Sequence, residues 1–383
     1  MPVDHLYVHV PFCASKCPYC DFNSHAGRDG EVPAYVEALV AEARARARDV
    51  APATVFVGGG TPTWPSAEAI DRMLDGVMSA VTTSRLTEVT VEANPGTLTP
   101  EKVRVLRRHG VTRVSLGAQS FDERRLRVLG RAHDARDTVR SVEVLRDGGV
   151  ERVSLDLILA TPGQSVGEQR RDVARAVALG PEHVSTYVLT FEEGTAFTKS
   201  LEEGRLEAPI EGRDLAHLRA ACEDLAAAGY RRYEVSNHAK PGAECRHNLG
   251  YWRNAQWLGL GAGAHSHVGG RRWKNVDDPA AYAARVAAAG EAVAWEEQPA
   301  PRSALFESLM MGLRLVDEGV DLAALAARHG VDPRVEHRDA IERHVVAGRL
   351  ERDGDRLRCT PAGIDVLNAV LVDFVPDEDD ARG

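Results

Sequence analysis

The sequence of 383 residues contains no uninterrupted apolar run approaching the roughly 18 residues of a membrane-spanning helix. Its start, Met1-Pro2-Val3-Asp4, lacks the basic segment and apolar stretch of a secretory signal. Positive charge is also in short supply, with 47 Lys and Arg against 57 Asp and Glu and a formal net charge of −10. That balance disfavours a general binder of polyanions. The sequence therefore predicts a cytoplasmic protein with no integral membrane segment and no nucleic-acid partner.

Cysteine is scarce as well, because six residues in a chain of this length are too few for a disulfide scaffold. Three of the six nevertheless fall within eight positions, at Cys13, Cys17 and Cys20. Clustered thiols in a reducing compartment indicate a metal site. The remaining composition, 44% hydrophobic and 27% charged, is typical of a globular protein, and the length predicts two or three domains.

Short β-branched runs alternate with segments of helical period through the first 190 residues. Six such repeats predict a parallel sheet, because parallel neighbours need crossover connections. Since eight repeats close a full barrel, we expect an α/β fold with an open, partial (β/α)6 TIM-like barrel over residues 1–190. The expected strands are Leu6–Val10, Thr54–Val57, Glu88–Glu92, Arg113–Leu116, Arg152–Leu157 and His183–Val188, and the expected helices are Pro33–Arg48, Ala67–Val81, Pro100–His109, Ala135–Arg146 and Val166–Leu179.

The rest of the chain divides into three further parts. Residues 191–303 are irregular and Gly-rich, and we expect them to cover the mouth of the barrel. Residues 304–375 show three helical segments and then a hairpin with a turn at Gly354-Asp355, the order of a winged-helix-like α+β domain. Residues 376–383 form an acidic segment that we expect to be a solvated, disordered tail.

Binding of DNA by the winged-helix-like domain, which would make the protein a regulator, belongs to a different class of function. Residues 305–383 contain ten Arg and no Lys against seventeen Asp and Glu, a net charge of −7. That sign repels phosphates. We therefore expect this domain to be a lid or a module for docking a partner.

The spacing Cys13-x3-Cys17-x2-Cys20 directly follows the first expected strand, which places the thiols at the catalytic face of a parallel barrel. Three thiolates can hold three irons of a [4Fe–4S] cluster and leave the fourth iron open to another ligand. Zinc is the alternative, with His9 or His25 as a fourth ligand. The sequence has no second Cys pair at zinc-ribbon spacing, and an aromatic residue, Tyr19, precedes the last Cys, so the cluster is favoured.

This cysteine loop resembles the signature of the radical S-adenosylmethionine (SAM) superfamily. The resemblance implies that SAM chelates the open iron through its amino and carboxylate groups. It also implies that reduction of the cluster cleaves the sulfonium and yields a 5′-deoxyadenosyl radical. In such a protein the cofactor carries the difficult chemistry and the chain positions it.

Polar residues near the ends of successive expected strands extend the resemblance. A Gly-rich run, Gly58-Gly59-Gly60-Thr61, follows the second strand and would let a ligand approach the backbone. These positions resemble the SAM contacts of the anaerobic coproporphyrinogen oxidase branch. By that resemblance, Tyr7 lies beside the cluster, Gly60 and Thr61 contact the methionine end, and Glu92, Gln119, Arg131 and Asp156 surround the carboxylate and ribose. The chain departs from the branch at Leu159-Ala160, where an aromatic-Gly pair is expected.

Two features separate this chain from the oxidase of that branch. Position 22 is Phe22, where the oxidase carries an additional Cys, and only five residues precede Leu6, where the oxidase has a longer extension. The segment from His247 to Trp252 reads H-N-x-x-Y-W. Together they resemble the HemW-type haem chaperones, which implies that the chain binds haem and passes it to acceptor proteins, with membrane respiratory proteins as candidates. The alternative is an oxygen-independent coproporphyrinogen III oxidase, and the sequence leaves open whether the protein turns over SAM as an enzyme.

The same motif suggests how haem is held. A neutral imidazole suits iron, so His247 is the preferred axial ligand, and the rings of Tyr251 and Trp252 can stack on a macrocycle. Spacing alone favours a plainer interpretation, in which His247 and Asn248 cap a turn and Trp252 fills the core. The other candidate ligands are Cys245, as a thiolate, and then His265 and His267.

Overall fold

A twelve-stranded sheet dominates the computed structural model, which describes residues 3–208 and 210–376. Its six central strands are parallel and neighbour one another in chain order. They are β1 His5–Val10, β4 Thr54–Gly59, β5 Glu88–Ala93, β6 Arg113–Gln119, β7 Arg152–Leu159 and β8 His183–Val188. The sheet has two free edges, at β14 and β9. The predicted open, partial barrel of parallel strands is confirmed.

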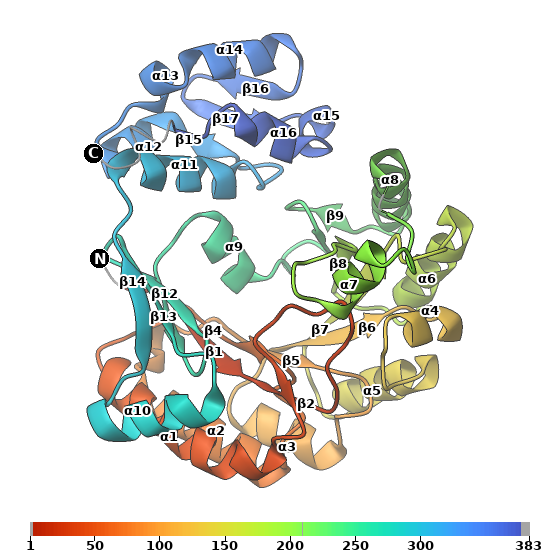
Figure 1. Cartoon of the computed structure of the whole chain (residues 1–383), viewed down its shortest axis with the longest axis vertical. Coiled ribbons are helices and arrows are strands. Elements are labelled where there is room, and N and C mark those ends of the chain that lie inside the picture. Colours follow the sequence, from red (N-terminus) through yellow and green to blue (C-terminus); the bar gives the residue numbers. More distant parts are fainter. Residues whose placement is uncertain (1–2, 209, 377–383) are drawn as a thin grey trace.

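Helices cover the outer side of this curved sheet, as Figure 1 shows. Side-chain caps fix where several begin: Ser66 accepts the N–H of Ala69, and reciprocal capping boxes form at Asp134 with Asp137 and at Ser165 with Glu168. The helices are α1 Val32–Arg46, α2 Ala67–Ala80, α3 Pro100–Arg108, α4 Glu123–Val128, α5 Ala135–Asp147 and α6 Val166–Ala178, with short 3₁₀ turns at Asp29–Glu31 and Thr83–Arg85.

The main core lies between the sheet and these helices. Val55, Val57, Val89 and Val91 on the strands are all at most 2% exposed and pack with the inward faces of the helices. Burial of each such side chain contributes about 1.5–3 kcal/mol. The strands alternate apolar and polar residues, as in the sequence EVTVEA of β5, because one face packs on the helices and the other faces the inside of the partial barrel.

Residues 191–303 contain more regular helices and strands than their irregular, Gly-rich sequence pattern suggests. Short strands extend the sheet at both edges: β10 and β9 beyond β8, and β11, β12, β13 and β14 beyond β1. Strand β11 is parallel to β1 and so adds a seventh parallel strand. The elements are α7 Ala196–Glu202, α8 Glu211–Ala227, β9 Arg231–Arg232, β10 Asn237–Ala239, α9 Arg246–Trp252, β11 Trp257–Leu260, β12 His265–Val268, β13 Arg271–Asn275, α10 Pro279–Ala289 and β14 Val293–Glu297.

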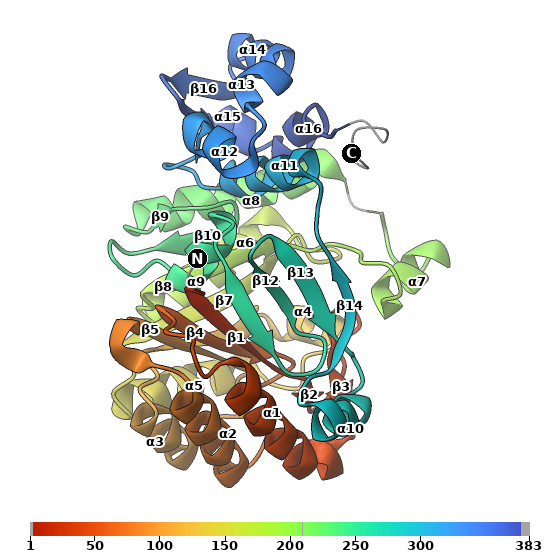
Figure 2. The ribbon, with the colours of Figure 1, turned by 90° about the vertical axis from the view of Figure 1, so that its left-hand side faces the viewer.

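A buried carboxylate joins this extension to the barrel. Glu42 on α1 is fully buried, and its Oε2 accepts the N–H of Gly261 at 2.8 Å and the hydroxyl of Tyr282 at 2.7 Å. Its Oε1 accepts a hydrogen bond from Nδ2 of Asn275 at 2.8 Å. These bonds hold α10, β13 and the loop after β11 against the first barrel helix, and Figure 2 shows α10 beside α1.

The C-terminal unit has its own core and its own three-stranded sheet, in the order β15-β17-β16. Figure 1 shows it above the sheet, with α9 between the two. The predicted hairpin is present, and Gly354 at its turn has φ of +58°. The elements are α11 Pro301–Gly312, β15 Val320–Asp321, α12 Leu322–His329, α13 Pro333–Glu336, α14 Arg338–Val346, β16 Leu350–Asp353, β17 Arg356–Cys359, α15 Pro361–Ile364 and α16 Leu367–Val372.

Two predictions concern what lies beyond these elements. The acidic tail expected at 376–383 lies outside the described residues apart from Pro376. Within residues 3–208 and 210–376, no helix combines the length and the apolar character that crossing a membrane requires.

Candidate functional site

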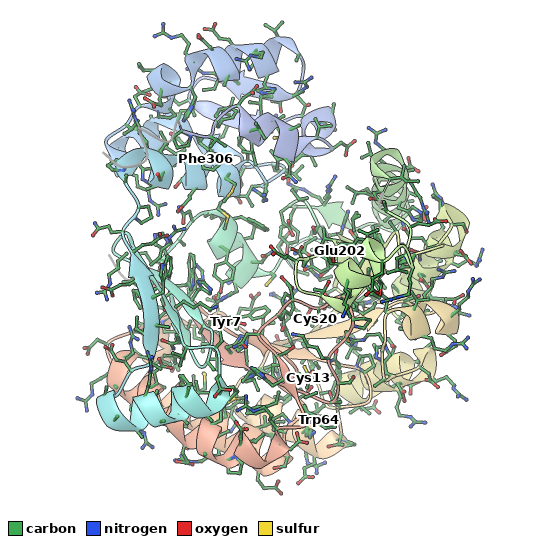
Figure 3. The ribbon with its side chains drawn as sticks, in the orientation of Figure 1. Tyr7, Cys13, Cys20, Trp64, Glu202 and Phe306 are labelled. Atoms are coloured by element: carbon green, nitrogen blue, oxygen red, sulfur yellow. The ribbon has the colours of Figure 1, made fainter. Side chains whose placement is uncertain are left out.

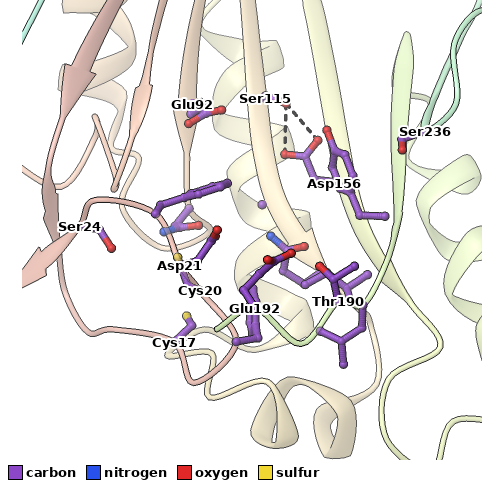
Figure 4. Close-up of a pocket in the computed structure, with 18 of the residues that line it drawn as sticks. Cys17, Cys20, Asp21, Ser24, Glu92, Ser115, Asp156, Thr190, Glu192 and Ser236 are labelled. Carbon is purple, nitrogen blue, oxygen red and sulfur yellow. Dashed lines mark hydrogen bonds between the residues drawn. The ribbon is translucent and has the colours of Figure 1, made fainter. Parts of the chain in front are cut away.

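A cavity of about 690 Å³ opens at the carboxyl ends of the parallel strands, and the cysteine loop forms part of its wall (Figure 4). The loop is closed at its base, where β2 (Phe12–Cys13) pairs in parallel with β3 (His25–Ala26). The N–H of His25 also donates to the carbonyl of Pro11 at 2.6 Å. Cys13, Cys17 and Cys20 all line this cavity.

Polar neighbours orient these thiols. Sγ of Cys13 lies 3.4 Å from Oγ1 of Thr61, and Nη1 of Arg131 donates to Sγ of Cys17 at 3.6 Å. The N–H of Cys20 donates to the carbonyl of Cys17 at 3.1 Å, which makes a tight turn. Among the residues that the structure describes, no three His, Cys, Asp or Glu side chains converge as they would around a single ion.

The Gly-rich turn after β4 has no room for larger side chains. A Cβ atom on Gly60 would lie 2.8 Å from the carbonyl oxygen of Phe12 and 3.0 Å from Sγ of Cys13. Gly59 has φ of +111°, and a Cβ there would meet the ring of His9 at 2.6 Å. Glycine is therefore required at both positions for the turn to pack against the cysteine strand.

Two carboxylates from neighbouring parts of the sheet line the cavity. Oδ1 of Asp156 accepts the hydroxyls of Ser115 at 3.1 Å and Ser185 at 2.7 Å; the contact with Ser115 is drawn in Figure 4. Oε2 of Glu92 accepts the N–H of Gly59 at 3.1 Å. Burial, with the charge of Asp156 as a second cause, raises the pKa of Glu92 to about 8, and burial also raises the pKa of Asp156. The cavity thus offers acceptors for a cation or for hydroxyl donors.

The remaining predicted contacts come from the end of β6 and the loop beyond it. The register of β6 against β7 shifts between Leu116 and Gln119, and Gln119 has φ of +63°, so the strand bends where Gln119 reaches the cavity. Arg131 donates to the carbonyl of Gly117 at 3.0 Å and to Oδ1 of Asn94. Arg131 therefore sets a positive charge beside Cys17 in the wall of the first cavity.

A second cavity, of about 530 Å³, adjoins the first. Phe22, Gly59 and Glu92 line both cavities, so the two spaces meet at these residues. Tyr7, which was expected beside the cluster, lines the second cavity rather than the first, and Tyr251 and Trp252 line the second cavity with it. Figure 3 shows Tyr7 on the inner side of the sheet. Thr61 lines neither cavity, is 2% exposed, and acts on the site through its contact with Cys13.

His247 also lines neither cavity, although it shares helix α9 with Tyr251 and Trp252. It is 1% exposed, and its Nδ1 lies 2.7 Å from Oγ1 of Thr54. Its ring packs against those of Phe56 and Tyr251, at centroid distances of 5.1 and 4.8 Å. Burial, and then the neighbouring His5, holds the pKa of His247 well below its ordinary value, so the ring is neutral.

Comparison with known proteins places this site in a family. The sequence pattern of the radical SAM superfamily matches residues 7–176, and that of the HemN C-terminal domain matches residues 300–366. A relative from Mycobacterium tuberculosis, named heme chaperone HemW, is 41% identical over 96% of this chain and 93% of its own length. A second, from Bacillus subtilis, is 36% identical over 85% of this chain and 86% of its own. The chain belongs to the HemW family of radical SAM proteins.

The family and the fold inferred from the cysteine loop and the H-N-x-x-Y-W motif are thereby confirmed. Coproporphyrinogen III oxidase HemN from Escherichia coli, described as a radical SAM enzyme, superposes with a TM-score of 0.84. The match covers 97% of this chain and 90% of that one at 20% identity, which shows a shared fold. At the position where the branch is expected to carry Gly, Ala160 of this HemW-family chain has φ of +56°, a conformation that glycine adopts without strain.

Several residues of the site were missed by the sequence analysis. Asn94 donates to Oγ1 of Thr61 at 2.7 Å and accepts from Arg131, so it links two predicted contacts. Ser115 lines the first cavity from β6, as Gln119 does, but the register shift between them interrupts the two-residue period that would have linked them. No local signal in the sequence places Asn368, which lines the first cavity from α16 of the C-terminal unit. The C-terminal unit thus contributes a residue to the wall of the first cavity.

Proposed function

We propose that the first cavity holds a [4Fe–4S] cluster on Cys13, Cys17 and Cys20, with SAM on the open iron. The observation that carries this proposal is the lining of one cavity by three thiols and no fourth Cys or His ligand among the described residues. A structural zinc site would normally use four ligands. Arg131 donates a hydrogen bond to Sγ of Cys17 and so sets a positive charge beside the proposed cluster ligands.

The other walls suit the charged ends of SAM. Arg131 can attract its carboxylate, whereas Glu92 and Asp156 can accept from its ammonium and ribose hydroxyl groups. The close packing of Gly60 on Cys13 brings bare backbone up to the cysteine strand, where a ligand can approach it. When bound together, cluster and cofactor supply one-electron chemistry, and the residues of this chain bind and orient them.

We further propose that the chain is a haem chaperone, which takes up haem and delivers it to acceptor haem proteins. Its relatives in the HemW family are named heme chaperones, and the chain aligns with one of them over nearly its whole length. The second cavity supports haem as the cargo, because the rings of Tyr7, Tyr251, Trp252 and Trp257 surround it. Respiratory haem proteins of the membrane are the acceptor class to test first.

The alternative function is radical decarboxylation of coproporphyrinogen. Phe22 occupies the position of the additional Cys of the oxidase, and its ring is 60% exposed where the two cavities meet. A phenyl ring there can pack against a flat ligand but cannot act as a thiol. We therefore favour binding and transfer of haem over conversion of its precursor.

Anaerobic reconstitution tests the cluster and its cofactor. We expect about four irons and four sulfides per chain and a change in the electron paramagnetic resonance spectrum of the reduced cluster when SAM is added. Cys17→Ser should abolish the brown absorbance, whereas Cys222→Ser, a half-buried thiol on α8, should keep it. A full cluster in Cys17→Ser, or uptake of zinc alone by the unmodified chain, would contradict the proposal.

A further inference from the structure

The second cavity has the size and lining of a site for a flat aromatic ligand. Its 530 Å³ falls within the range of about 300–1,000 Å³ that is usual for ligand pockets. Its aromatic side chains come from β1, α9 and β11, and the rings of Tyr251 and Trp257 meet edge to face at 4.9 Å. Met311 from the C-terminal unit completes the apolar lining. The barrel strand β1, the later segment with α9 and β11, and the C-terminal unit thus all border this open cavity.

Two histidines line this cavity, and only one has a ring that is free to bind iron. Nδ1 of His9 contacts the hydroxyl of Tyr7 at 2.9 Å and Nε2 contacts the carbonyl of Asn23 at 2.7 Å, so both nitrogens are used. His265 on β12 is exposed, and among the described residues its ring nitrogens have no hydrogen-bond partner. Lys274 lies directly opposite His265 in the β12–β13 pair and lines the same cavity. Its ammonium group, which pairs with Asp277 at 2.8 Å, can also attract a carboxylate of the ligand.

His247 has a different position and a different set of contacts. Its Nδ1 is held by Thr54, and its N–H donates to Oε1 of Glu88 at 3.2 Å, at the amino ends of the strands. Its Nε2 is buried within the protein, and the ring does not line the second cavity. These contacts fasten the start of α9, so that Tyr251, one turn further on, reaches the cavity. His247 is thus a positioning residue for the aromatic wall.

We propose that haem binds in the second cavity with the imidazole of His265 as its iron ligand, whereas His247 anchors helix α9. This inference rests on the proposed function as a haem chaperone. It revises the preference drawn from the H-N-x-x-Y-W motif and favours a ligand that the sequence analysis ranked lower. The macrocycle would lie among the rings of Tyr7, Tyr251 and Trp257, beside Phe22 at the junction with the first cavity. Partial burial of the ring, and then the charge of Lys274, lowers the pKa of His265, which favours the neutral ring that binds iron.

Haem titration of the full chain carrying its cluster tests the assignment. His265→Ala should weaken haem binding at least tenfold, about 1.4 kcal/mol, and remove the spectral signature of imidazole ligation. Added imidazole should restore that signature, because the substitution leaves space beside the iron. His109→Ala, which removes a histidine at the end of α3 that lines neither cavity, is the matched control and should bind haem like the unmodified chain.

The variant His247→Gln distinguishes a role as iron ligand from a role in positioning helix α9. Circular dichroism verifies that the variant is folded. A positioning role predicts weaker haem binding with the imidazole signature retained. The inference is overturned if His265→Ala keeps its affinity and signature, or if folded His247→Gln loses the signature. Both outcomes leave the proposed function standing, provided that the unmodified chain binds one haem. If the unmodified chain carries its cluster but binds no haem, the proposed function fails and the inference fails with it.

Discussion

Replacement of Glu88 by Gln should loosen helix α9, because this carboxylate is the main anchor of its first turn. Glu88 is 1% exposed and accepts the N–H groups of Arg246 and His247, each at 3.2 Å, and the thiol of Cys245 at 3.6 Å. It also lies 3.8 Å from Nη1 of Arg152. A hydrogen bond to a charged group contributes about 1.5–3 kcal/mol. Gln removes the charge and turns an amide donor toward groups that are themselves donors.

We expect Glu88→Gln to lower the free energy of opening of α9 by about 3 kcal/mol, the lower end of the range for breaking a buried charge pair. That loss corresponds to amide hydrogen exchange more than a hundredfold faster in residues 246–252, since about 1.4 kcal/mol is tenfold. Amides of α14 in the C-terminal unit should be unaffected. Glu37→Gln, which removes the surface ion pair with Arg72, is the control and should lower the free energy of unfolding by less than about 1 kcal/mol. Unchanged protection of α9 in Glu88→Gln would refute the anchoring role.

Three further predictions concern the first cavity. Burial beside Asp156 raises the pKa of Glu92 from 4.5 to about 8, so the folded chain binds a proton at Glu92 more tightly than the unfolded chain does. The free energy of unfolding should therefore fall as the pH rises from 4.5 to about 8, by at most about 1.4 kcal/mol per pH unit. In urea unfolding at pH 5.5 and 7.5, Glu92→Gln should remove this contribution to the difference in free energy of unfolding between the two pH values. An unaltered difference would be inconsistent with a proton on Glu92. Gly60→Ala should reduce the iron bound after reconstitution by more than half, because its Cβ would clash with the cysteine strand, and normal iron content would mean that the turn adjusts freely. Asp156→Ala should keep the iron but weaken the spectral response to SAM, and a full response would remove Asp156 from the proposed contacts.

The barrel and its cysteine loop could be predicted because their signals are local. Strands such as Thr54–Gly59 and Glu88–Ala93 are β-branched runs between helical segments, and the spacing of Cys13, Cys17 and Cys20 is specific in itself. Strands β11 to β14 were missed because each has only four or five residues. β11 is stabilised by pairing with the distant strand β1, and β12, β13 and β14 follow it as antiparallel neighbours.

The position of His247 could not be predicted either. The motif places His247 and Tyr251 four residues apart, so a helix puts them on one face. Which of these two side chains reaches the cavity depends on how closely helix α9 packs on the strands. The contacts of His247 with Glu88 and Thr54 set that position, and both residues are more than 150 residues away in the sequence.

The most direct test of the account is a haem titration and a coproporphyrinogen assay on one anaerobically reconstituted preparation. A haem chaperone of the HemW family should bind one haem per chain, release it to an apo-haem acceptor protein, and form no protoporphyrinogen in the presence of SAM and a reductant. Decarboxylation of coproporphyrinogen by that preparation, or a chain that carries its cluster but binds no haem, would contradict the central claim.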